Sequence, residues 1–111
     1  MLLLFVTLSV SARKLTGRVV DDVTGRTIPT ATVVLLSIED SSVVATAIMK
    51  SDTTWSNDIY SYYNIENVQN NTEYILRASA IGYETAYKRV KVRMGERVAQ
   101  QWVGDIKLKE N

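Results

Sequence analysis

Four aromatic residues lie close together in the middle of the chain, and their side chains are the best suited to bind a ligand or a partner. They are Trp55, Tyr60, Tyr62 and Tyr63. An exposed aromatic ring is a large, rigid contact surface with few torsions to freeze, so it stacks well on sugar rings or on partner proteins. In a strand, Tyr60 and Tyr62 share one face and Tyr63 lies on the other. We expect Tyr60 and Tyr62 to pack in the core and Trp55, in a polar loop, to be the better contact residue.

A second group of candidate contact residues is basic and consists of Arg89, Lys91, Arg93 and Arg97. The first three alternate along one predicted strand and so share a face. This stripe suits an acidic partner or anionic headgroups. It is also typical of a solvated strand face whose cations guard the edge of a sheet, and this is what we expect here. The formal net charge of the whole chain is only +1, which argues against a nucleic-acid partner.

The remaining side chains argue against catalysis. The chain of 111 residues has no histidine and no cysteine. It therefore lacks the commonest general base, the commonest metal ligand and the usual partner of a catalytic serine. Asp21 and Asp22, with Asp40 or Asp58, could gather a calcium ion, but their spacing fits no compact calcium loop, and we expect carboxylates that form turns. We predict a protein that is not an enzyme and needs neither a metal nor a cofactor.

Short strands separated by turn signals must position these residues. The segments are rich in β-branched and aromatic residues, and none keeps a helical period. We predict an all-β fold, a seven-stranded antiparallel sandwich of the transthyretin-like, Greek-key kind and of immunoglobulin-like size. The predicted strands are Leu15–Val20, Ala31–Ile38, Val43–Met49, Ile59–Ile65, Glu73–Ala80, Ala86–Met94 and Ala99–Leu108.

Alternation along the last two predicted strands assigns their faces. In Ala86–Met94, Val90, Val92 and Met94 are expected to point inward and Arg89, Lys91 and Arg93 outward. In Ala99–Leu108, simple alternation places Trp102, Gly104, Ile106 and Leu108 inward and Asp105 and Lys107 outward.

The amino terminus has the pattern of an export signal. An apolar run, Leu2–Val10, is too short to span a bilayer as a helix, and Ser11 and Ala12 follow it before Arg13. This matches the apolar region and cleavage site of a secretory signal peptide, although no basic residue precedes the run. We predict a signal peptide over residues 1–12 and the sandwich domain over 13–111.

Three motifs, in order along the chain, resemble the carboxypeptidase regulatory-like domain family. The first is the opening from Leu15 to Val33, with Gly-Arg-Val-Val-Asp, a Thr-Gly turn and a Pro before Ala-Thr-Val. The second is Ile81-Gly82-Tyr83, and the third is the closing Val-Gly-Asp-Ile-Lys-Leu segment that ends at Leu108. The chain departs from the family pattern at Pro29-Thr30, where the family has Pro-Gly.

The resemblance implies a transthyretin-like sandwich without enzymatic activity. Domains of this kind precede the plug and barrel of TonB-dependent outer-membrane receptors in Bacteroidota. The expected role is therefore an accessory module in the periplasm or at the bacterial outer membrane, whose partner is a protein of the cell envelope such as a receptor plug or barrel. The domain itself is not expected to span the membrane. The alternative is a carbohydrate-binding module that holds a glycan on its exposed aromatic residues.

Overall fold

The structure, a computed structural model, describes residues 13–53, 59–95 and 97–111. Its regular elements are all strands, as the alternating and β-branched segments predict, and none of the described residues forms a helix that could cross a membrane. The strands are β1 (Lys14–Asp21), β2 (Thr32–Ser37), β3 (Val43–Thr46), β4 (Ile48–Thr53), β5 (Ile59–Ile65), β6 (Glu73–Ser79), β7 (Ala86–Lys91) and β8 (Gln100–Leu108).

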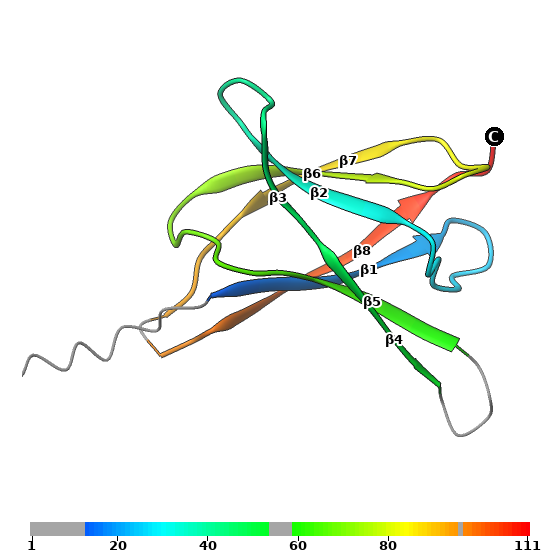
Figure 1. The fold of residues 1–111 in the computed structure, drawn as a ribbon, viewed down its shortest axis with the longest axis horizontal. Helices are drawn as coiled ribbons and strands as arrows, with labels where there is room; N and C mark the ends of the chain where they lie inside the picture. The colour runs from blue at the N-terminus through cyan, green and yellow to red at the C-terminus, as the bar shows by residue number, and fades with distance from the viewer. Residues whose placement is uncertain (1–12, 54–58, 96) are drawn as a thin grey trace, which may run out of the picture.

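The strands form a sandwich of two four-stranded sheets (Figure 1). The first sheet has the order β4-β5-β1-β8 and the second the order β3-β2-β6-β7. Both contribute fully buried side chains to one core, among them Leu15, Tyr63 and Leu108 from the first sheet and Leu35 and Leu76 from the second. The inner β2 strand is buried on both faces, as its continuous apolar run predicts.

The predicted third strand, Val43–Met49, is wrong, because this segment is two strands in different sheets. The chain leaves the second sheet after Thr46 and enters the first at Ile48, so that the sandwich has eight strands instead of seven. The Ala47 amide still donates to the Val33 carbonyl at 2.8 Å, which keeps the crossing point attached to β2. The segment Val43–Met49 contains no glycine, proline or other turn residue, so the sequence gives no sign that the chain changes sheets here.

The predicted all-β sandwich is confirmed, but it is not antiparallel throughout, because β1 and β8 run parallel. The chain leaves the first sheet after β5, forms the β6–β7 hairpin in the second sheet, and returns at the end where β1 begins. There the Lys14 amide donates to the Ala99 carbonyl at 2.8 Å. Because β8 enters beside the start of β1, it has to run in the same direction, as Figure 1 shows.

Candidate functional site

The outer face of the first sheet carries the largest group of surface aromatic rings in the described part of the chain. Tyr60 and Tyr62 come from β5, Arg18 from β1, and Trp102 and Asp105 from β8. The register brings Trp102 beside Thr16 and Asp105 beside Arg18, and alternation turns these side chains away from the core. We call these five residues the outer-face cluster.

A bulge in β8 places Trp102 on this face. The pairing of β1 with β8 shifts between Thr16 and Arg18, so that Val103 and Gly104 together lie opposite Gly17. Gly104 has a φ of 90°, a conformation that glycine adopts without strain. One extra residue reverses the alternation on the N-terminal side of the bulge, so Trp102 is 52% exposed while Ile106 and Leu108 remain buried. The inward orientation that simple alternation predicts for Trp102 is therefore wrong.

Arg18 is the centre of the outer-face cluster. Its Nε donates to Asp105 Oδ1 at 2.7 Å and its Nη2 to Asp105 Oδ2 at 2.9 Å, which is the bidentate geometry of a strong arginine–carboxylate pair. The guanidinium carbon lies 5.7 Å from the ring centroid of Tyr60 and 5.7 Å from that of Trp102, within cation–π range of both. The hydrogen bonds to Asp105 raise the pKa of Arg18 above its ordinary value, so the guanidinium stays charged.

Two of the rings beside Arg18 also lie close to each other. The Tyr60 and Tyr62 ring centroids are 6.0 Å apart and both side chains are partly exposed. Fixed aromatic faces beside a fixed ion pair can stack on flat or weakly polar groups and can exchange hydrogen bonds at the rim. Such groups suit the binding of a ligand or partner.

The structure distributes the four predicted aromatic contact residues differently from expectation. Tyr63 is fully buried, and Tyr60 and Tyr62 are on the surface, so the assignment of Tyr60 and Tyr62 to the core is wrong. Tyr63 pairs with Gly17 of β1, whose missing side chain makes room for the ring. Trp55 lies outside the described residues. The sequence patterns do not mark Trp102, Arg18 or Asp105 as site residues, although a glycine inside a strand pattern is a known sign of a bulge.

The basic stripe has the exposure that alternation predicts. Arg89, Lys91, Arg93 and Arg97 are all exposed, while Val90, Val92 and Met94 between and beside them are buried. The stripe follows β7, which is an edge strand of the second sheet, as expected.

Side chains bridge the edge of β7 to β8. The side-chain amide of Gln101 donates through Nε2 to the Lys91 backbone carbonyl at 3.0 Å, and its Oε1 accepts from the Arg93 backbone N–H at 2.8 Å. Lys88 Nζ donates to the Val103 carbonyl at 2.9 Å. These contacts occupy backbone groups that a further strand would need.

The acidic residues considered for calcium serve the turns. Asp21 accepts hydrogen bonds from the Val23 and Thr24 amides and from the Tyr83 hydroxyl. Asp40 accepts from the Ser42 amide and hydroxyl. Asp58 is not among the described residues, and no three acidic side chains of the described ranges gather as a metal site.

No family model and no curated protein matches the chain. Among solved structures, it is similar to the shaft pilin SpaA from Lactobacillus rhamnosus GG, determined as a double mutant, with a TM-score of 0.56 and 12% sequence identity. The match covers 90% of this chain and 46% of the pilin, so the chain spans about half the length of that protein. The likeness is one of fold. It shows that the fold of this chain is similar to part of a pilin.

Proposed function

We propose that this chain is a non-catalytic interaction module of an exported bacterial cell-envelope protein. Three observations support the proposal: the signal-like run at Leu2–Val10, a sandwich fold shared with a shaft pilin, and a side-chain inventory without histidine or cysteine. The observation that carries it is the outer-face cluster, where Arg18 is fixed between Tyr60 and Trp102 on an open sheet face. A surface with rings exposed and ordered in advance loses little entropy on binding.

The specific role that we propose is that of the periplasmic N-terminal module of a TonB-dependent nutrient-uptake receptor. The motifs around Leu15 to Val33, at Ile81 to Tyr83 and near Leu108 support this placement through their resemblance to the carboxypeptidase regulatory-like family. In this role the module contacts the receptor plug, the barrel or an associated envelope protein. It transports nothing itself.

Genomic context and a binding measurement test the receptor role together. We expect a plug-and-barrel coding sequence in the same gene or beside it. Binding of the purified domain to that plug should weaken at least about tenfold in Trp102→Ala, because a central exposed aromatic residue usually carries much of the binding energy. The matched control is Tyr87→Ala, since Tyr87 is 64% exposed on the second sheet. Absence of any such gene, or equal weakening in both variants, contradicts the receptor role.

Binding of a carbohydrate is the second candidate function, and the composition of the outer-face cluster favours it. Tyrosine and tryptophan rings can stack on the apolar faces of sugars, while Arg18 and Asp105 offer donors and acceptors to hydroxyl groups. Calorimetric titration with oligosaccharides tests it, with Trp102→Ala and Tyr87→Ala as before. Millimolar binding that only Trp102→Ala removes supports the glycan, and no heat from any oligosaccharide ends this candidate.

A further inference from the structure

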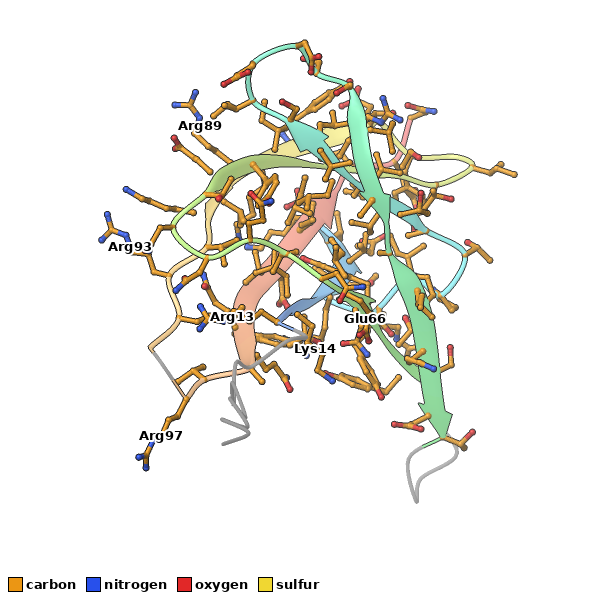
Figure 2. The ribbon with its side chains drawn as sticks, turned by 60° about the vertical axis from the view of Figure 1, so that its left-hand side comes forward. Arg13, Lys14, Glu66, Arg89, Arg93 and Arg97 are labelled. Atoms are coloured by element: carbon orange, nitrogen blue, oxygen red, sulfur yellow. The ribbon has the colours of Figure 1, made fainter. Side chains whose placement is uncertain are left out.

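Six of the 13 basic residues of this nearly neutral chain lie in two segments, residues 13–14 and 89–97. The chain has 13 basic and 12 acidic residues, and Figure 2 shows Arg89, Arg93 and Arg97 along the left-hand edge, with Arg13 and Lys14 further in, toward the middle of the view. Lys91 alternates with Arg89 and Arg93 on the same strand face. We call these six residues the basic face.

Two distant segments build the basic face. Arg13 and Lys14 begin β1, and Arg97 lies in the turn that leads into β8. The hydrogen bond from the Lys14 amide to the Ala99 carbonyl holds the two segments together. The face is therefore a product of the fold and does not depend on one flexible run of charge.

Few acidic residues neutralise this face. Among the described residues its one ion pair joins Arg89 Nε to Glu73 Oε1 at 3.7 Å, and both side chains are largely exposed. Glu66 lies nearby in Figure 2, and Glu96 belongs to the same turn in sequence. Six cations against these three carboxylates leave a local excess of positive charge, which attracts anions and weakens with salt.

An exposed apolar side chain, and the position of these cations just after the signal-like run, favour a membrane surface as the partner. Val98, which is 45% exposed, follows Arg97 in the turn, and cations beside an exposed apolar side chain are typical of a membrane-surface contact. The apolar run Leu2–Val10 ends shortly before Arg13. Cleavage of the predicted signal peptide before Arg13 would add a positive α-amino group next to these cations.

We propose that the basic face docks the domain on an anionic phospholipid surface. The guanidinium and ammonium groups contact the headgroup phosphates, and Val98 enters the interface between them. This proposal does not depend on a receptor or a glycan, although Lys14 of the basic face lies on the same outer face of the first sheet as Arg18 of the outer-face cluster.

Vesicle co-sedimentation of residues 13–111 tests the proposal. We expect binding to vesicles with about 30% phosphatidylglycerol, little binding to pure phosphatidylcholine, and loss at about 0.5 M salt. The double variant Arg93→Glu/Arg97→Glu should bind at least about tenfold more weakly, because each basic residue near an anionic surface contributes several-fold to the affinity. Thermal unfolding followed by circular dichroism checks that each variant is folded.

The matched control reverses two exposed lysines at the other end of β8, Lys107→Glu/Lys109→Glu, and should leave binding nearly unchanged. Val98→Ser separates a membrane from a soluble polyanion: it should weaken binding to the vesicles but not to polyglutamate. Three results would each overturn the proposal. They are no binding to the anionic vesicles, equal loss in both charge variants, and equal binding of Val98→Ser and wild type to vesicles.

Discussion

The Tyr63 ring occupies the space that a side chain at Gly17 would fill. A Cβ atom at Gly17 would lie 2.7 Å from Tyr63 Cζ, closer still to its hydroxyl oxygen, and 2.8 Å from the Gly104 carbonyl oxygen. Two of these atoms belong to a fully buried ring and one to the backbone of the β8 bulge, so none can move away cheaply. The contact connects β5, β1 and β8 directly beneath the outer-face cluster.

Gly17→Ala should lower the free energy of unfolding by about 1–3 kcal/mol, the usual cost of adding a methyl group to a filled core. Urea unfolding followed by circular dichroism measures it. Gly95→Ala is the control, because a Cβ there meets only Val98 Cγ2 at 3.7 Å, an ordinary contact. Equal stability of Gly17→Ala and wild type would show that the ring does not fill this space.

The hydroxyl group of Tyr63 gives a second prediction with the opposite sign. It is buried without a hydrogen-bond partner among the described residues, and burial raises the pKa of Tyr63, which keeps the group neutral. Tyr63→Phe removes a polar atom whose desolvation is uncompensated, so the free energy of unfolding should stay the same or rise.

Tyr74→Phe is the matched comparison for this change. The Tyr74 ring is also buried, but its hydroxyl accepts a hydrogen bond from the Gln69 amide at 3.2 Å. Losing that bond should cost about 1 kcal/mol in the same urea experiment. A larger loss in Tyr63→Phe than in Tyr74→Phe would mean that the Tyr63 hydroxyl has a partner in solution.

Local patterns were sufficient to predict most strands and their inner faces. Ile59–Ile65 is a strand with the predicted bounds, and Tyr74, Leu76 and Ala78, which alternate along β6, are buried on one of its faces. These features depend only on neighbouring residues, so alternation with a period of two is enough to predict them.

Features set by distant segments could not be predicted in this way. Whether the chain changes sheets at Ala47 depends on which strands compete for pairing, and nothing local distinguishes the two outcomes. Arg18 and Asp105 are 87 positions apart and meet only because β1 and β8 run parallel. The bulge at Gly104 then decides which side chains join them, so the candidate site follows from topology.

The turn carboxylate of Asp21 predicts how stability depends on pH. The backbone hydrogen bond from Thr24, then the Tyr83 hydroxyl and the Val23 amide, lower the pKa of Asp21 below its ordinary 3.8. Folding thus favours the charged carboxylate. Its contribution to the free energy of unfolding is complete above the ordinary pKa and is lost as the pH falls through the lower pKa of the folded state. Asp21→Asn should be less stable than wild type at neutral pH, and the difference should shrink as the pH falls below about 4.

Asp22→Asn is the control for this experiment, because Asp22 is exposed and next in the chain. Thermal unfolding from pH 7 down to about pH 2 measures both variants against wild type. A difference between Asp21→Asn and wild type that does not change with pH would contradict the proposed role of the charge.

The pairing of Arg18 with Asp105 predicts a measurable coupling on the outer face. Both side chains are about one-third exposed, at 34% and 30%, so solvent screens the pair and the coupling should be about 0.5–1 kcal/mol. A double-mutant cycle with Arg18→Ala, Asp105→Ala and the double variant isolates this energy in urea unfolding. Arg18→Lys should recover little of it, because lysine keeps the charge but loses the bidentate geometry. A coupling energy near zero would mean that Asp105 does not hold Arg18 in place. In that case any loss of binding in Trp102→Ala would come from the Trp102 ring alone, without a contribution to binding from an ordered guanidinium.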